Sequence, residues 1–233
     1  MHHAREFLFD DSDALSDALA WDVGQTLRAA IAAREQASLV VSGGRTPLGL
    51  FNRLSAQDLA WHNVIVTLAD ERWVEPDAAA SNERLVRLEL LRDKAAHAHF
   101  IGLKSSAGAA ANSEMHVWRT LAHVPRPFDL VLLGMGDDGH TASLFPTAAA
   151  IASALDASLP PACIAMEAPV VPHSRLSFNL AALLDARRIV LQIQGAKKWQ
   201  VYQTAQLAGA ATAMPIRAVL RQSRVPVDVY WSP

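Results

Sequence analysis

The chain contains a single cysteine, Cys163, among its 233 residues. One thiol cannot form a disulfide within the chain, so the sequence gives no support to an oxidising compartment. No apolar run approaches the ~20 residues that a membrane-spanning helix needs, and the first residues lack the apolar core of a signal peptide. We therefore expect a cytoplasmic protein that does not enter a membrane.

An excess of charge of one sign is also missing. The 21 basic residues are balanced by 23 acidic ones, and the formal net charge is −2. This balance gives no general electrostatic reason to expect nucleic acid or an anionic membrane surface as a partner. Any anion site must therefore be local.

Several familiar site motifs are absent as well. The glycines of residues 42–46 are not followed by the Gly-Lys-Ser/Thr of a P-loop, and no Gly-x-Gly-x-x-Gly fingerprint follows a first strand. A Gly-x-Ser-x-Gly elbow is missing too. His97, His99 and His116 have no cluster of carboxylates or cysteines at ligand spacing nearby, so we interpret them as surface or helix residues and expect no metal site.

What the sequence does contain is an alternation of helical and strand patterns. Apolar side chains recur every four residues from Leu15 to Ile31, which predicts an amphipathic helix over residues 12–35. Further helices are predicted after Pro47 and over residues 81–91 and 197–207. Strands are predicted over residues 38–41, 63–68, 130–133, 162–166, 188–193 and 227–231.

This alternation predicts an α/β protein. A mainly parallel sheet with helices on both faces, a three-layer Rossmann-like fold, is the arrangement that such a pattern favours. The hydrophobic content of 51% is ample for a core, and no low-complexity linker or fixed-period repeat divides the chain. We therefore expect one domain over residues 1–233.

Unusual polar loops follow three of the predicted strands. They are residues 42–46 (SGGRT), 70–72 (DER) and 138–140 (DGH). In open parallel α/β sheets ligands bind at the carboxyl ends of the strands, so we expect the three loops to form one cleft. In residues 42–46, paired glycines ahead of a helix expose N–H groups that favour an anion such as phosphate, although a tight turn alone also explains them.

His140 is the candidate for acid–base chemistry. An unperturbed imidazole titrates near pH ~6.5, so it can accept and return a proton near neutrality. Asp138 or Asp70 could orient its ring, and the sequence leaves open which of them does so. The plainer alternative is a strand-to-helix loop in which Asp138 or Thr141 caps the next helix.

Three cations near these loops have two interpretations each. Arg72 could stabilise the substrate or an oxyanion, or it could form a structural ion pair with Asp70 or Glu71. Arg175 and Lys198 lie beside other predicted strands, where they could close around the same anion or remain solvated surface charges.

Four ordered motifs together resemble the family of 6-phosphogluconolactonases and glucosamine-6-phosphate deaminases. They are residues 42–47 (SGGRTP), residues 70–74 (DERWV) followed by Ser81-Asn82, residues 134–146 (GMGDDGHTASLFP) and Gly195-x-x-Lys198. The resemblance implies hydrolysis of 6-phospho-D-glucono-1,5-lactone, a small-molecule phosphosugar lactone, in the pentose phosphate pathway. It also implies that no metal or organic cofactor takes part.

On this basis we predict two groups of site residues. The catalytic group consists of His140, Asp138, Asp70 and Arg72. The group that binds the phosphate of the substrate consists of Gly43, Gly44, Arg45, Thr46, Arg175 and Lys198. Arg45 departs from the family pattern, because many relatives have serine there.

Phe145 separates the two reactions of the family. The resemblance implies that deaminases carry a glutamate five residues after the motif histidine, and this chain carries Phe145 at that position. The difference favours lactone hydrolysis. Two alternatives remain open, a glucosamine-6-phosphate deaminase or isomerase and a non-catalytic regulator that binds sugar phosphates. The chain is expected to be a monomer or a small homo-oligomer.

Overall fold

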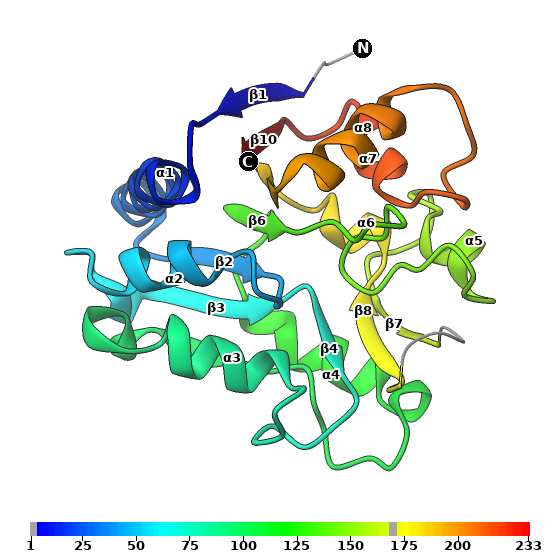
Figure 1. The fold of residues 1–233 in the computed structure, drawn as a ribbon. Coiled ribbons are helices and arrows are strands. Elements are labelled where there is room, and N and C mark those ends of the chain that lie inside the picture. The colour runs from blue at the N-terminus through cyan, green and yellow to red at the C-terminus, as the bar shows by residue number, and fades with distance from the viewer. Residues whose placement is uncertain (1–3, 168–171) are drawn as a thin grey trace.

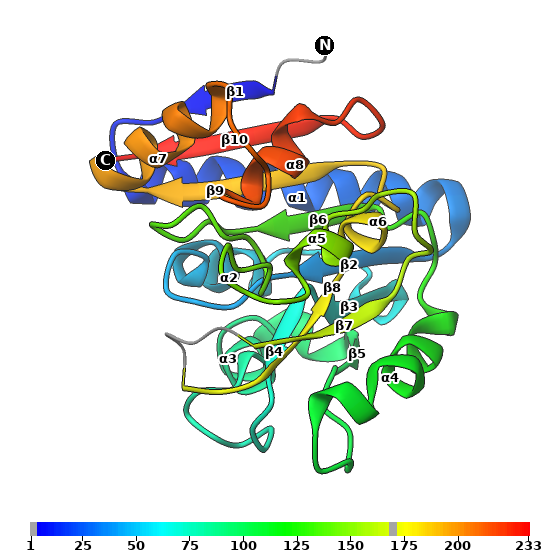
Figure 2. The same cartoon turned by 90° about the vertical axis from the view of Figure 1, so that its right-hand side faces the viewer.

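A computed structural model describes residues 4–167 and 172–233. Its main sheet contains the strands β1 (Arg5–Leu8), β2 (Ala37–Val41), β3 (Val64–Leu68), β5 (His99–Ile101), β6 (Leu130–Leu133), β9 (Ile189–Gln194) and β10 (Val227–Ser232). They lie in the order β1-β10-β9-β6-β2-β3-β5, and every neighbouring pair is parallel. Figure 2 shows them stacked from β1 at the top to β3 near the middle of the molecule.

Helices cover both faces of this sheet. The described residues form the helices α1 (Ser12–Arg34), α2 (Leu48–Ser55), α3 (Asn82–Glu89), α4 (Glu114–Thr120), α5 (Ile151–Ala154), α6 (Leu180–Leu183), α7 (Ala196–Gln206) and α8 (Ile216–Arg221). Helix α1 packs against β2 and β10, whereas α7 packs against β9. Figures 1 and 2 show α1 on one side of the sheet and α7 with α8 on the other. The predicted three-layer α/β architecture is confirmed.

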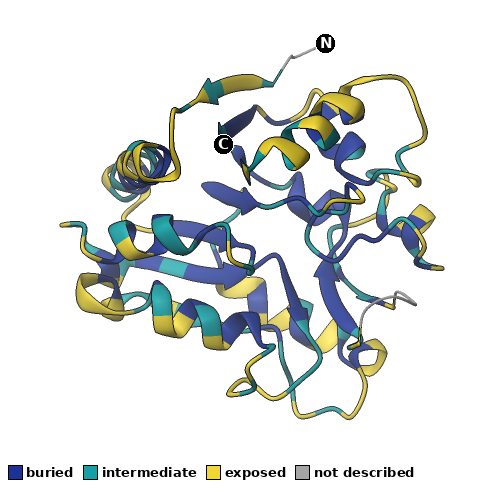
Figure 3. Cartoon of the chain, viewed as in Figure 1, coloured by how far each residue is buried: buried dark blue, intermediate teal, exposed yellow. Residues whose placement is uncertain are grey.

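The core lies between these layers. Strands β2 and β6 are buried along their whole length, which Figure 3 shows as dark blue ribbon at the centre of the molecule. Helix α1 buries the predicted apolar stripe, including Leu19 and Leu27. Its N-terminus is capped by Asp11, whose side chain accepts hydrogen bonds from two backbone N–H groups of the first turn.

A second, antiparallel sheet corrects two predictions. It contains β4 (Asp70–Arg72), β7 (Cys163–Met166) and β8 (Arg175–Phe178), in the order β4-β8-β7. Residues 70–72 were expected as a loop, but their backbone pairs with β8. The strand expected at residues 162–166 exists, but it belongs to this small sheet. A short apolar run does not show which strand it will pair with. The alternation of helical and strand patterns therefore assigned residues 162–166 to the main sheet.

Two classes of feature are absent from residues 4–167 and 172–233. No helix there is long and apolar enough to cross a membrane. No group of three or more His, Cys, Asp or Glu side chains in the same residues is placed to hold a metal ion. His97, His99 and His116 are all exposed, although His99 lies on strand β5 and not on a helix.

Candidate active site

A cleft of about 230 Å³ opens at the carboxyl ends of β2 and β6, next to β4 and the first turns of α3 and α7. Eight of the ten predicted site residues line it: Gly43, Gly44, Arg45, Thr46, Asp70, Arg72, His140 and Lys198. Asp138 and Arg175 lie outside the lining. The structure therefore brings segments from both ends of the chain together, as the strand-end argument predicted.

The glycine loop after β2 forms one wall of the cleft. The N–H of Ser42 donates to the carbonyl of Leu132 at 3.0 Å, which ties the start of the loop to β6. Gly44 has φ = +96°, a conformation that side-chain-bearing residues rarely adopt. At Gly43 a Cβ atom would lie 1.9 Å from Oδ1 of Asn82. Both glycines are therefore required by the backbone here, one for its conformation and one for close packing.

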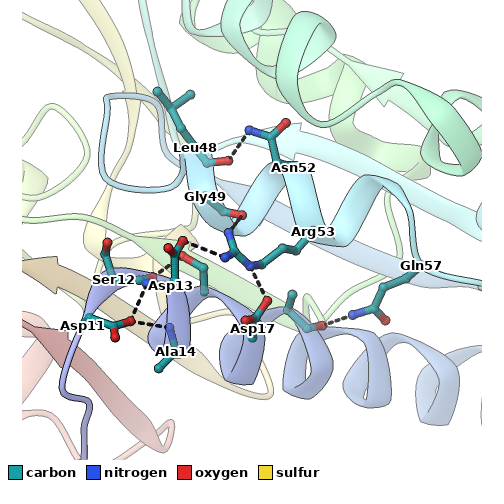
Figure 4. A network of polar contacts seen from close by, with 12 residues as sticks. Asp11, Ser12, Asp13, Ala14, Asp17, Leu48, Gly49, Asn52, Arg53 and Gln57 are labelled. Carbon is teal, nitrogen blue, oxygen red and sulfur yellow. Dashed lines mark hydrogen bonds and ion pairs between the residues drawn. The ribbon is translucent and has the colours of Figure 1, made fainter.

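Helix α2 holds the other end of the loop, and it is clamped onto α1. Figure 4 shows the guanidinium of Arg53 reaching the carboxylates of Asp13 and Asp17 on α1, with Nη2 of Arg53 2.7 Å from Asp13. Nε2 of Gln57 donates to the carbonyl of Ala20 at 2.6 Å. These contacts come from the last turn of α2 and from the residue after its C-cap, and they hold the helix against α1.

The loop after β6 presents His140. The N–H of Gly136 donates to the carbonyl of His140 at 2.9 Å, which folds the loop back on itself. Nδ1 of His140 lies 2.6 Å from Oδ1 of Asp138. Because Asp138 occupies Nδ1, Nε2 is the ring nitrogen left for the cleft. Of the two aspartates that the sequence left open, Asp138 is the one in contact with this ring.

The carboxylate of Asp138 stays ionised in this arrangement. Burial by itself would raise the pKa of Asp138, but hydrogen bonds from the side chain and backbone of His140 outweigh it and lower the pKa below its ordinary value. No helix follows directly, because the next one begins at Ile151. The hydroxyl of Thr141 donates to the carbonyl of Gly134 at 2.9 Å, so neither side chain caps a helix as the plainer alternative required.

Strand β4 carries Asp70 and Arg72 into the cleft. Oδ2 of Asp70 accepts a hydrogen bond from the hydroxyl of Ser143 at 2.5 Å. Nη1 of Arg72 donates to the carbonyl of Ala80 at 2.5 Å, and its Nε is buried without a partner among the described residues. Within the described part of the chain, Arg72 forms no ion pair with Asp70 or Glu71 within 4.0 Å. The structural ion pair considered for Arg72 is therefore not observed.

Glu71, between these two residues, points away from the cleft and anchors β4 to α3. Its carboxylate accepts from the N–H groups of Arg72, Asn82 and Glu83, each at 2.7 Å, and from the hydroxyl of Ser81 at 3.0 Å. Burial raises the pKa of Glu71, and these hydrogen bonds oppose the rise. Four donors thus converge on one buried carboxylate.

We expect Glu71→Gln to destabilise the protein by about 1–3 kcal/mol, since a glutamine NH₂ group would face N–H donors in place of an acceptor oxygen. Urea denaturation followed by circular dichroism measures the change in the free energy of unfolding. The control is Asp77→Asn on the exposed loop that follows, where we expect less than about 0.5 kcal/mol. Equal stabilities of Glu71→Gln and the parent protein would contradict the anchoring role.

Two cations converge on the glycine loop without a counter-ion. Lys198, on the first turn of α7, is half-buried, and the pKa of its ammonium is lowered first by burial and then by the nearby Arg45, while Asp137 acts in the opposite direction. Among the described residues, neither Arg45 nor Lys198 has a carboxylate within 4.0 Å, whereas the exposed Lys197 pairs with Asp137 at 2.6 Å. This part of the cleft therefore suits an anion.

Sequence reasoning missed three polar side chains that line the cleft: Ser42, Asn82 and Gln192. All three are buried, and each has an oxygen without a protein partner in residues 4–167 and 172–233. Asn82 stood within a motif that carried the family resemblance, but nothing assigned it a role. The sequence contains one indication of a role for Gln192, since it is a lone amide within the apolar run of a predicted strand.

The model of the family of glucosamine-6-phosphate isomerases/6-phosphogluconolactonase matches residues 10–231. The chain belongs to this family. It is 45% identical to a 6-phosphogluconolactonase of Rhizobium meliloti (strain 1021) over 230 residues, 99% of each chain. It is 43% identical to a 6-phosphogluconolactonase of Pseudomonas putida over 223 residues, 96% of this chain and 90% of the other.

A solved structure agrees with these relatives. The crystal structure of a 6-phosphogluconolactonase from Shewanella baltica OS155 superimposes with a TM-score of 0.96 at 46% sequence identity, covering 99% of this chain and 98% of that one.

This member of the glucosamine-6-phosphate isomerase/6-phosphogluconolactonase family packs Phe145 against its motif histidine. The ring centroids of Phe145 and His140 lie 4.6 Å apart, and Phe145 is 5% exposed. The guanidinium of Arg175 lies 5.9 Å from the centroid of the Phe145 ring, and its Nε donates to the carbonyl of His173 at 3.2 Å. At the position where the resemblance implies a deaminase glutamate, this family member therefore has no carboxylate.

Proposed function

We propose that this protein is a 6-phosphogluconolactonase, which hydrolyses 6-phospho-D-glucono-1,5-lactone to 6-phosphogluconate. The observation that carries the proposal is the pairing, in one cleft, of an Asp138-oriented His140 with an anion-binding loop flanked by Arg45 and Lys198. The relatives named 6-phosphogluconolactonase, which match almost the whole chain, support it. Such an enzyme would act in the cytoplasm on a small phosphosugar, as a monomer or small homo-oligomer.

His140 is the general base of the proposed reaction. Nε2 of His140 takes a proton from water while the water oxygen attacks the lactone carbonyl carbon. The tetrahedral intermediate then collapses, the bond between this carbon and the ring oxygen breaks, and the imidazolium returns the proton to the departing ring oxygen. Asp138 keeps the proton of the resting imidazole on Nδ1 and stabilises the imidazolium that forms.

Arg72 and Asp70 complete the reacting end of the cleft. An oxyanion develops on the lactone carbonyl oxygen in the transition state, and a positioned cation stabilises it more than it stabilises the neutral ground state. We assign this role to Arg72, whose Nε has no protein partner among the described residues. Asp70, held by Ser143, lines the same part of the cleft, and we assign it to positioning the substrate or the water.

The phosphate of the substrate is assigned to the glycine loop. Backbone N–H groups of residues 43–46, ahead of α2, suit its oxygens, while Arg45 and Lys198 supply positive charge. The contribution of Arg175 stays a prediction, because this side chain lies beside Phe145 and outside the lining of the cleft.

A lactonase assay tests the proposal directly. Freshly made 6-phospho-D-glucono-1,5-lactone is added to the protein, acid release is followed by pH-stat titration, and spontaneous hydrolysis is subtracted. We expect saturable turnover well above the background. Ammonia release from glucosamine 6-phosphate without lactone turnover would show a deaminase instead, and tight binding of 6-phosphogluconate without any turnover would show a sugar-phosphate-binding regulator.

A further inference from the structure

Gln192 interrupts a strand that is otherwise apolar along its buried length. It lies on β9, between β6 and β10, opposite Tyr230 of β10, and it is 4% exposed. Its neighbours Leu191 and Ile193 are fully buried. Burying an amide in such surroundings is unfavourable unless its polar atoms form hydrogen bonds, so a buried glutamine in a central strand requires a physical explanation.

The amide of Gln192 is directed at the glycine loop. Its Nε2 donates to the carbonyl of Thr46 at 3.2 Å, just before the first turn of α2. The connection spans 146 positions in the sequence and joins β9 to the loop that follows β2. The residue thus supports the loop from the sheet.

The turn around Gly44 borders open space. No atom beyond its chain neighbours lies within 4 Å of the position that a Cβ of Gly44 would take. The loop also has open space behind it, because a second cavity of about 100 Å³ shares Arg45, Thr46 and Gln192 with the cleft. These three residues form the wall between the two cavities, and Gln192 is the buried one among them.

We propose that Gln192 is a positioning residue that sets how the Arg45–Thr46 turn faces the phosphate of the substrate. By holding the carbonyl of Thr46, it fixes the Thr46–Pro47 peptide plane, which carries no N–H. Through the ψ angle of Thr46 this restricts the preceding peptide plane, and therefore the direction of the N–H group of Thr46. The inference rests on the proposed function, since it assigns the turn to the phosphate. Gln192 acts on the phosphate through Thr46 and needs no contact with the lactone carbonyl.

The test compares Gln192→Leu with the parent enzyme. Leucine suits a buried strand, so the variant is expected to fold, and its melting temperature is measured to confirm this. Loss of one neutral hydrogen bond predicts a rise in KM for the phosphorylated lactone of about 2–12-fold, with kcat within about twofold. Titration calorimetry should show a matching loss of affinity for 6-phosphogluconate and no change for gluconate, which lacks the phosphate.

Two further variants sharpen the result. Gln192→Glu keeps the shape but sets an acceptor oxygen against the carbonyl of Thr46, so KM should rise further than in Gln192→Leu. Gln194→Leu, on the exposed end of the same strand, should leave KM unchanged.

An unchanged KM in Gln192→Leu, or a fall in kcat with KM constant, would overturn the positioning role. Absence of turnover in the parent enzyme would instead overturn the proposed function. Calorimetry still decides in that case, because 6-phosphogluconate binding that is equal in the parent protein and Gln192→Leu refutes the positioning role without any turnover.

Discussion

Replacing His140 with alanine should lower kcat for the phosphorylated lactone by about 10²–10⁴-fold, the usual effect of removing a positioned general base. KM should change little, because the proposed phosphate contacts lie elsewhere in the cleft. The measurement is steady-state kinetics on fresh lactone with spontaneous hydrolysis subtracted. The matched control is His116→Ala, which removes an exposed histidine on α4 and should leave kcat unchanged.

Asp138→Asn provides a second check on the same assignment. An asparagine NH₂ group that donates to Nδ1 of His140 would move the ring proton to Nε2, where it blocks proton abstraction from water. We expect kcat to fall while KM stays near that of the parent enzyme. Near-parental kcat in His140→Ala would refute the assignment of His140 as the general base.

Replacing Lys198 with alanine should raise KM by about 10–150-fold, the effect expected when one charge-assisted contact to a phosphate is lost. The effect on kcat should be much smaller, because the phosphate is remote from the bond that breaks. Lys197→Ala is the control, since Lys197 is the adjacent, exposed lysine and pairs with Asp137. Equal losses of kcat in Lys198→Ala and His140→Ala would contradict this division of roles.

The pH dependence gives a further test of Lys198. Burial and the nearby Arg45 lower the pKa of its ammonium, so the unliganded enzyme loses this charge at a lower pH than an ordinary lysine would. A lost cation weakens phosphate binding. KM should therefore rise as the pH increases through this lowered pKa, and the rise should be missing from the profile of Lys198→Ala.

The order and type of the main elements could be read from local patterns. The four-residue apolar repeat from Leu15 predicted α1 almost to the residue, and the apolar runs before the polar loops predicted β2, β3 and β6. The rule that ligands bind at strand ends then grouped residues 42–46 with His140 correctly. These predictions succeeded because each depends on periodicity and glycine positions within a few residues of chain.

The small antiparallel sheet could not be read in the same way. Strand β4 is three residues long and fully polar, Asp70-Glu71-Arg72, so it carries neither alternation nor an apolar run. It forms because its backbone pairs with β8 from more than a hundred residues later. Strand pairing is a property of two segments, and a pattern in one of them does not identify its partner.

The sequence by itself determined the alternating α/β architecture, the glycine-rich loop of residues 42–46 at a strand end and the presence of a histidine between a carboxylate and Phe145. Only the tertiary structure decided that Asp138 contacts Nδ1 of His140, that Glu71 faces α3, and that Gln192 supports Thr46 from a distant strand. The physical reason is the distance along the chain over which each effect acts. Periodicity, capping and glycine conformation act over a few residues, whereas the partner of a buried polar group is chosen by whichever segments the sheet brings together.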